Sequence, residues 1–318
     1  MNKIIDQITR ARKIIIAGHV NPDGDCIGSM LALGLGLESI GKEVSMYIAG
    51  KLPRIYDFLP GSKKISNSTN FKAELAIAVD CNCREMLGPV YPAFCEAKTI
   101  AAIDHHEYRR AFSHIRFLDY KASCVGEMVY KVLKKMKVAI SKDIATNILT
   151  SLLIETNSFR FPSVNKNSFK LAQRLLEHGV DYNEIVNNLF FSTLREVAVL
   201  SGICMARCKF ANNGKIVWSE IYKDDFKQQR GKDEHVDAVA DQMRSIKGVE
   251  AAFLFREKNS LWLRVSLRSK NKVNVALLAE AYGGGGHFDV AGCVIKNSQK
   301  EINRFLSDAK RLLQTGKI

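Results

Sequence analysis

The sequence predicts an α/β protein, with an N-terminal domain built on a doubly wound, mainly parallel sheet and a second, smaller α/β domain. Three short apolar runs, at residues 14–17, 75–79 and 100–103, are separated by helical patterns and are each followed by polar residues. Runs of this kind are typical of parallel strands buried on both faces. The 318 residues exceed the roughly 250–300 at which a single core stops growing. From Phe210 onward, alternating apolar and polar residues replace these continuous runs, which indicates a second domain.

The elements follow from the spacing of apolar residues along the chain. An amphipathic helix is expected over residues 1–13, and a second one over residues 26–40, between the turn residues 21–25 and Gly41. Further helices are predicted over residues 125–137, 142–153, 168–178, 182–191 and 193–208. Strands are predicted over residues 215–221, 251–256 and 261–267. We place the first domain at residues 1–190, a helical linker at 191–210 and the second domain at 211–318.

Composition and charge limit the classes of partner. The longest apolar runs are far shorter than the about 18 residues that a membrane helix needs, so we expect a cytoplasmic protein without a membrane partner. Eight cysteines in a chain of this length, without a secretion signal, are expected to be reduced thiols. The net charge of +14 favours polyanionic partners such as nucleic acid or nucleotides.

Acidic and histidine side chains follow the three apolar runs at the point where each ends. His19, Asp23 and Asp25 follow the first run, Asp80 follows the second, and the third ends in Asp104, His105 and His106. Because the carboxyl ends of parallel strands lie at one edge of a sheet, we expect these side chains to converge. Carboxylates with a few imidazoles suit hard cations such as Mn²⁺ or Mg²⁺ better than zinc or copper.

Several carboxylates gathered at one edge repel one another unless cations neutralise them. Two divalent ions that share Asp80 can activate a water molecule for attack on phosphorus, which predicts phosphoester hydrolysis. Each residue taken alone has a structural alternative, such as a turn for Asp23, a helix cap for Asp25 or Asp80, and a hydrogen-bonded imidazole for His106. The coincidence at three strand ends favours the metal site.

A second group of polar residues and glycines lies in the predicted second domain. It consists of Arg264, Ser266, Arg268 and Ser269, followed by Gly283, Gly284, Gly285, Gly286 and His287. Glycines allow positive φ angles, so their N–H groups can form an anion-binding nest, while arginine offers a planar fork to phosphate oxygens. The alternative is a flexible glycine turn beside a basic strand. We expect this group to bind the phosphate of a substrate.

These residues resemble the successive sequence motifs of a known family. GHVNPDGDCIGSMLALGLGL, AVDC, AIDHH and ETNSFRF are similar to motifs of the DHH phosphoesterases, and VSLRSK with AYGGGGHFDVAG is similar to the family-1 DHH-associated domain. The resemblance extends from the first strand to residue 293. Within the family, the two-domain layout is most similar to the nanoRNA oligoribonucleases that also act as adenosine 3',5'-bisphosphate phosphatases.

The resemblance implies a role for each site residue. His19, Asp23 and Asp80 would hold one Mn²⁺, and Asp25, Asp80 and His105 the other, completed by the carboxylate of the ETNSFRF motif. Asp104 would orient His105, and His106 would contact the scissile phosphate. Arg268, Ser269 and His287 would bind the phosphate or base of the substrate. Mg²⁺ and Co²⁺ are the alternative ions.

One motif departs from the family pattern. Where the family has Asp-Thr-Gly, this chain has Glu155, Thr156 and Asn157. Glutamate can still bind a metal, but the added methylene moves the carboxylate by about an ångström or more. We therefore expect the second metal site to bind its ion more weakly, or through a bridging water. Asparagine tolerates the left-handed backbone that glycine adopts.

We therefore expect a two-metal phosphoesterase that hydrolyses short single-stranded oligoribonucleotides to 5'-mononucleotides and also acts on the 3'-phosphate of adenosine 3',5'-bisphosphate. Three alternatives stay open: a phosphodiesterase for cyclic dinucleotides or linear pApA, a nucleic-acid-binding member weakened through Glu155, and hydrolysis of polyphosphate or pyrophosphate. The GGGGH sequence argues against the last of these. The sequence does not decide the oligomeric state, a homodimer being among the alternatives.

Overall fold

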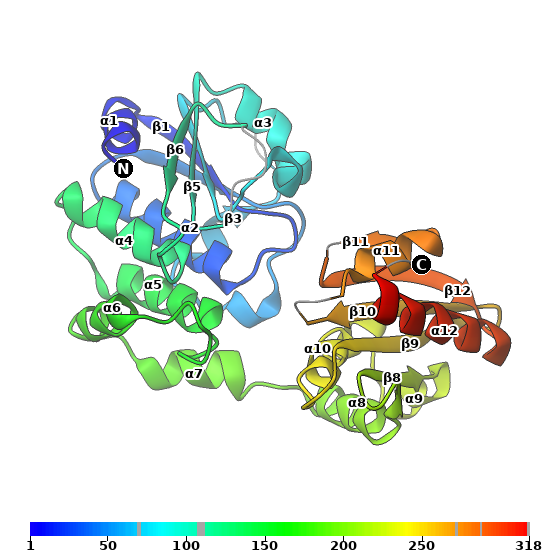
Figure 1. The fold of residues 1–318 in the computed structure, drawn as a ribbon. Helices are drawn as coiled ribbons and strands as arrows, with labels where there is room; N and C mark the ends of the chain where they lie inside the picture. Colours follow the sequence, from blue (N-terminus) through cyan, green and yellow to red (C-terminus); the bar gives the residue numbers. More distant parts are fainter. Residues whose placement is uncertain (69–70, 107–111, 271–272, 287, 317–318) are drawn as a thin grey trace. The chain divides into compact units, whose positions relative to one another are not determined.

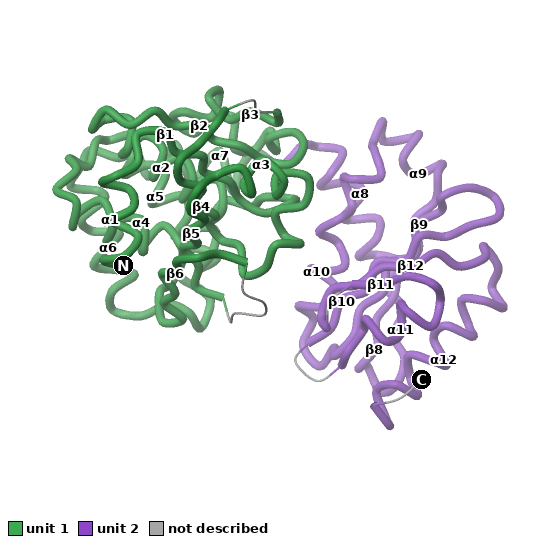
Figure 2. Tube along the Cα trace, turned by 90° about the horizontal axis from the view of Figure 1, so that it is seen from above, with its two compact units in different colours: residues 1–192 green, residues 193–318 purple. Residues whose placement is uncertain are grey.

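The computed structural model of the chain describes residues 1–68, 71–106, 112–270, 273–286 and 288–316. The chain divides into two compact units, residues 1–192 and 193–318 (Figure 2). Each unit has its own sheet and its own buried core, so the two are described separately.

The first unit is built on a six-stranded sheet in which every pair of neighbouring strands is parallel (Figure 1). The strand order is β3-β2-β1-β4-β5-β6. The strands are β1 (Lys13–Ala17), β2 (Glu43–Tyr47), β3 (Ile65–Ser66), β4 (Leu75–Val79), β5 (Thr99–Asp104) and β6 (Ile115–Leu118). The three strands predicted from apolar runs, β1, β4 and β5, are direct neighbours in the middle of the sheet.

Both faces of this sheet are covered, which explains the continuous apolar runs. Ile14 and Ile16 pack into a large core with the helices on one face, whereas Ile15 and Ala17 face a smaller core on the other. The helices are α1 (Asn2–Arg10), α2 (Gly24–Glu38), α3 (Tyr91–Cys95), α4 (Val125–Lys135), α5 (Lys142–Glu155), α6 (Lys166–Leu176) and α7 (Tyr182–Phe190). Short 3₁₀ turns are η1 (Arg54–Tyr56), η2 (Ser62–Lys64) and η3 (Arg84–Val90).

Helices α2 and α5 pack against each other at unusually close range. A Cβ atom at Gly28 would overlap the carbonyl oxygen of Asn147, and one at Gly24 would overlap the side chain of Ile154. Glycine is therefore required on this face of α2, because any side chain would push the helices apart. The close approach sets the distance between the first turn of α2 and the last turn of α5.

The second unit is built on a six-stranded mixed sheet with the order β11-β12-β10-β9-β8-β7. Only β8 and β9 are parallel among its paired strands in the described residues. The strands are β7 (Lys209–Ala211), β8 (Ile216–Ile221), β9 (Ala251–Asn259), β10 (Trp262–Ser269), β11 (Gly285–Gly286) and β12 (Val290–Lys296). The helices are α8 (Arg195–Ala206), α9 (Lys223–Gln228), η4 (Asp233–Val236), α10 (Val239–Arg244), α11 (Val275–Ala281) and α12 (Gln299–Thr315).

The predicted fold class is confirmed: a parallel α/β unit is followed by a smaller unit with a mixed sheet. The helix expected from residue 26 begins at Gly24, because Asp23 caps it and accepts hydrogen bonds from the N–H groups of Asp25 and Cys26. Helix α8, expected in a linker, lies within the second unit. Among the described residues no single helix meets the length and hydropathy expected of a membrane span, although α7 and α8 do so as a pair bent by 53°.

Replacing Gly28 with alanine tests the close packing of α2 on α5. We expect Gly28→Ala to lower the free energy of unfolding by about 1–3 kcal/mol, because the added methyl group overpacks the contact with Asn147. Gly202→Ala in α8 is the matched control, since a Cβ atom there meets nothing within 4 Å, and it should stabilise by about 0.5–1 kcal/mol through helix propensity. Urea unfolding of both variants checks this. Equal effects of the two substitutions would contradict the tight contact.

Candidate functional site

The carboxyl ends of β1, β4 and β5 lie side by side and carry the predicted metal ligands. His19 follows β1, Asp80 follows β4, and Asp104 is the last residue of β5. His105 and His106 come next along the chain, and Asp25 is in the first turn of α2. The convergence expected from the sequence is present at this edge of the sheet.

His19 faces two carboxylates with one ring nitrogen. Its Nδ1 lies 2.8 Å from the carbonyl oxygen of Val20, which can only accept, so Nδ1 carries the proton and Nε2 is left with its lone pair. Nε2 lies 3.4 Å from Asp80 Oδ2 and 3.9 Å from Asp23 Oδ1. Burial would lower the pKa of this imidazole, but the two carboxylates together outweigh burial and raise it. Nε2 therefore carries a proton in the absence of a cation and presents its lone pair when a cation takes the place of that proton.

His105 is held in the same way on the other side of the cluster. Its Nδ1 donates to the carbonyl oxygen of Ala122 at 3.1 Å, so Nε2 again presents a lone pair. That Nε2 lies 3.6 Å from Asp25 Oδ2 and 3.7 Å from Glu155 Oε1. It is buried and has no hydrogen-bond partner among the described residues. A lone pair that faces two carboxylates is repelled by both unless a cation lies between them.

Asp25 is fully buried and is fixed by donors from three elements. Its Oδ1 accepts hydrogen bonds from Ser29 at 3.0 Å and Ser151 at 2.6 Å, and its Oδ2 accepts from the N–H of Val125 at 2.9 Å. Burial, and then the charge of Asp80, raise the pKa of this carboxyl well above its usual value. The hydrogen bonds therefore orient a group whose charge the protein alone stabilises poorly.

Glu155, the departure from the family pattern, reaches the cluster. It is the last residue of α5, and its carboxylate oxygen belongs to a group of three ligand atoms, with Asp25 and His105, that lie within 4.8 Å of one another. Burial, followed by the charges of Asp80 and Asp23, raises the pKa of Glu155 to about 7. The additional methylene does not remove the carboxylate from the second group of ligands.

Asp80 lies in the middle of the cluster. Its φ of 58° is in the left-handed region, where a non-glycine residue is strained by about 1–2 kcal/mol. Oδ2 lies 3.4 Å from His19 Nε2, and Oδ1 lies 3.3 Å from His106 Nδ1. Burial would raise the pKa of Asp80, but the imidazoles of His106 and His19 hold it well below its usual range. This carboxylate is placed to be shared between two ions.

The structure changes the role expected for Asp104. The resemblance implied that it orients His105, but its Oδ1 lies 3.0 Å from Nδ1 of His106 and accepts the N–H of the same residue at 3.1 Å. His105 is oriented by the carbonyl group of Ala122 instead. The carboxylates of Asp104 and Asp80 raise the pKa of His106 to about 11. Its side chain is 44% exposed, whereas both carboxylates are buried.

The residues present fit two divalent cations. Three sets of donors have ligand atoms within 4.8 Å of one another: His19, Cys26 and Asp80; Asp80, His105 and His106; Asp25, His105 and Glu155. Two of the sets share Asp80, and apart from the thiol of Cys26 the donors are carboxylate oxygens and imidazole nitrogens, which suit Mn²⁺ or Mg²⁺. Sequence reasoning missed Cys26, whose buried thiol lies next to Gly18. Its place directly after Asp25 was the available signal.

In the second unit, several predicted substrate-binding side chains have partners inside the unit. The hydroxyl of Ser266 accepts from Arg256 at 2.6 Å, and that of Ser269 donates to the carbonyl oxygen of Val273 at 2.6 Å. The Nε of Arg268 donates to Asp241 at 2.9 Å. Arg264 is 55% exposed and pairs with Asp233 at 3.1 Å. Of these four, only Arg264 lines the pocket described below.

The N–H groups of the glycine tract are not all available to bind an anion. The N–H groups of Gly283 and Gly284 donate to carbonyl groups in the last turn of α11, and Gly285 and Gly286 form the short strand β11 against β12. A Cβ atom at Gly284 would overlap the carbonyl oxygen of Gly292. Close packing on β12 is therefore one reason for glycine here. His287 lies outside the described residues.

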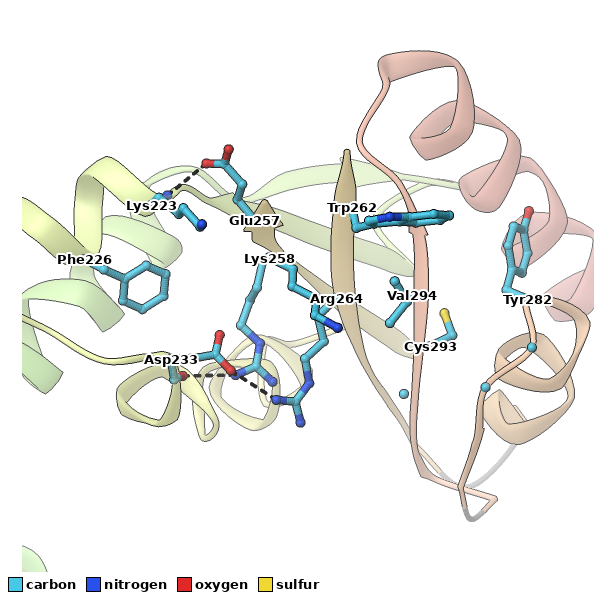
Figure 3. Close-up of a pocket in the computed structure, with 14 residues that line it drawn as sticks. Lys223, Phe226, Asp233, Glu257, Lys258, Trp262, Arg264, Tyr282, Cys293 and Val294 are labelled. Carbon is cyan, nitrogen blue, oxygen red and sulfur yellow. Dashed lines mark hydrogen bonds and ion pairs between the residues drawn. The ribbon is translucent and has the colours of Figure 1, made fainter. Parts of the chain in front are cut away.

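A pocket of about 1050 Å³ lies beside this tract, and all of its lining residues belong to the second unit. Figure 3 shows Lys223 and Phe226 on one side, Trp262 and Tyr282 on the other, and Arg264 between them. Sequence reasoning named Arg264, Gly283 and Gly284 but missed the aromatic and lysine side chains. The alternation along β10, which places Trp262 and Arg264 on one face, was the available signal.

Comparison with known proteins agrees with this geometry. Residues 13–154 match the N-terminal domain of the DHH family, and residues 213–315 match the DHHA1 domain. The chain is similar to the bifunctional oligoribonuclease and PAP phosphatase NrnA of Thermus thermophilus, with 29% identity over 286 residues that cover 89% of this chain and 84% of that protein. The Bacillus subtilis protein of the same name is 27% identical over 315 residues, which cover 98% and 97%. A crystal structure of an exopolyphosphatase-related protein from Bacteroides fragilis has 25% identity, covers 98% and 97% of the two chains and superposes with a TM-score of 0.87.

The raised pKa of Glu155 predicts how stability depends on pH when metal is removed. The pKa of Glu155 is about 7 in the folded protein, and its ordinary value is 4.5. The contribution of Glu155 to the free energy of unfolding is therefore fully present below pH 4.5 and is lost as the pH rises through 7. In the presence of chelator we expect Glu155→Gln to be more stable than the natural protein at pH 8, by up to about 3 kcal/mol, and the difference to shrink toward pH 5.

Urea unfolding at the two pH values measures this difference. Glu177→Gln, at an exposed glutamate after α6, is the control and should change little at either pH. Saturating Mn²⁺ should make the natural protein more stable than Glu155→Gln at pH 8, because the natural protein then gains the binding energy of the ion. A Glu155→Gln variant that is less stable than the natural protein at pH 8 without metal would contradict the placement of Glu155.

Proposed function

Because the chain belongs to the DHH family of phosphoesterases and carries a DHHA1 domain, we propose that it hydrolyses short single-stranded oligoribonucleotides to 5'-mononucleotides. We propose that the same site removes the 3'-phosphate of adenosine 3',5'-bisphosphate. Two divalent ions serve the reaction, with Mn²⁺ preferred over Mg²⁺ and Co²⁺. Its partners are therefore short RNA and nucleotides, encountered in the cytoplasm without a membrane.

The observation that carries this proposal is the pair of imidazoles whose Nε2 atoms face carboxylates. His19 and His105 are both fixed through Nδ1 by backbone carbonyl groups, so both Nε2 atoms are left for cations. The carboxylates of Asp80, Asp25 and Glu155 lie 3.4–3.7 Å from those nitrogens. This donor set supports two hard cations around a shared carboxylate.

The ions, when bound, polarise the phosphoryl group and supply an activated water. The residues of the chain contribute orientation and contact with the substrate. Asp104 holds the Nδ1 side of His106, so the opposite edge of this exposed ring is left to hydrogen-bond the phosphate or the leaving oxygen. Asp104 and Asp80 are buried beneath it, so His106 is the member of the group that a substrate can touch.

Three further observations support RNA as the substrate. The net charge of +14 attracts polyanions, and the pocket of the second unit joins aromatic side chains to lysines and arginines. The relatives named oligoribonuclease and PAP phosphatase cover most of this chain. The place of Glu155 among the ligand atoms argues against a member that has lost catalysis.

Incubation with labelled dinucleotides to pentanucleotides and Mn²⁺ should release 5'-mononucleotides, and chelator should stop the release. Asp80→Asn should lower kcat at least about a thousandfold, because one substitution disturbs both metal sites. Lys310→Ala, at an exposed position on α12, should leave kcat unchanged. Cyclic di-AMP, linear pApA and pyrophosphate complete the substrate panel. Turnover of one of these in place of short RNA would overturn the substrate assignment.

Shortening or removing the side chain of residue 155 tests the second metal site separately. We expect Glu155→Ala to raise the Mn²⁺ concentration needed for half-maximal activity at least about tenfold. Glu155→Asp should have a smaller effect in the same direction, because its carboxylate is withdrawn by about 1.5 Å from His105. Metal titrations monitored by activity and by calorimetry check both variants. An unchanged requirement in Glu155→Ala would remove Glu155 from the ligand set.

A further inference from the structure

The sheet of the second unit leaves part of one face uncovered. On one face, buried side chains such as Phe253 and Val265 lie under α11 and α12. On the other face, Val217 and Leu254 of β8 and β9 lie under α8 and α10. Beyond those helices, at β10 and β12, Trp262 remains 39% exposed and Val294 42% exposed. Adjacent exposed apolar side chains at the wall of a pocket indicate a binding surface.

The same pocket is basic. Four cationic side chains line it against the two carboxylates of Asp233 and Glu257. Arg256 is buried and is held by Asp233 and Asp237, so its role is structural. Lys223 and Lys258 are exposed and their ammonium groups make no ion pair with any described residue. Lys223 and Lys258 therefore leave positive charge free to meet an anionic ligand, beside the exposed Arg264, which pairs with Asp233.

An indole ring next to unpaired ammonium groups matches a nucleotide in single-stranded nucleic acid. Bases stack on aromatic side chains without regard to sequence, and lysine or arginine binds the adjoining phosphate. A metal ion does not fit this pocket, because Asp233, one of its two carboxylates, already pairs with Arg256 and Arg264. All groups of metal donors found in the described residues lie in the first unit.

We propose that this pocket binds a nucleotide of a single-stranded RNA substrate, with its base stacked on Trp262 and its phosphate on Lys258 and Arg264. The inference rests on the proposed function, since it concerns the same RNA substrate. A base that stacks on the indole adds binding energy that a simple anion lacks, so the pocket selects nucleotides over inorganic phosphate through affinity.

Binding measured without catalysis tests the proposal. The full-length protein is stripped of metal with chelator and titrated with a fluorescent tetra-adenylate, whose anisotropy reports binding. We expect Trp262→Ala to weaken binding about tenfold, which is within the range for loss of one stacked base, and Trp262→Phe to retain most of the affinity. Lys258→Ala should weaken binding several-fold and lower the slope of affinity against salt by about one ion. Lys310→Ala, on the helix that covers the opposite face, should stay within twofold of the natural protein.

Inorganic phosphate, measured by competition, is the second ligand, and the thermal unfolding of each variant confirms folding. Trp262→Ala should leave the affinity for phosphate unchanged, because phosphate has no base to stack. Equal tetra-adenylate binding by Trp262→Ala and the natural protein would overturn the stacking site, and an equal loss for both ligands would overturn the stacking of a base on Trp262. If RNA is hydrolysed but Trp262→Ala binds tetra-adenylate as tightly as the natural protein, only the stacking proposal fails. If Trp262→Ala weakens binding but no RNA is hydrolysed, only the proposed function fails.

Discussion

The repulsion among buried carboxylates at the end of the parallel sheet is the constraint on which the first unit depends. Asp25 and Asp80 are buried and Glu155 is partly buried, all three beside imidazole nitrogens, and uncompensated charge away from solvent is costly. The surrounding elements are organised to orient these groups. Ser29 of α2, Ser151 of α5 and the first N–H of α4 all donate to Asp25. The close contact of α2 and α5 keeps these donors in place.

Much of the fold was predictable because burial leaves a simple pattern in the sequence. Strands β1, β4 and β5 are covered on both faces, so their residues are almost all apolar. Strand β2 could not be recognised in this way, because only Met46 among its five residues is buried. Strand β3 has two residues and β11 consists of two glycines, so neither carries a periodic signal.

The site was predictable to the extent that topology determines it. Parallel strands bring their carboxyl ends together, so the three clusters of acids and histidines converge. The side chain that each group contacts depends on local geometry instead. Asp104 binds the second histidine of its motif because its carboxylate turns toward the Nδ1 of His106. The pocket around Trp262 depends on which part of a sheet face the helices leave open, and strand alternation alone does not contain that information.

Asp233 competes with any incoming anion for the arginine side chains in the pocket of the second unit. Its carboxylate occupies Arg264 and Arg256 at the same time, so an incoming phosphate must share or displace an anion that is already present. A small anion such as inorganic phosphate gains little from that exchange, because it offers one charge in place of another. A ligand that also covers the indole ring gains the stacking energy in addition. The ion pair therefore lowers the affinity of the pocket for simple anions, whereas a nucleotide offsets this loss by stacking.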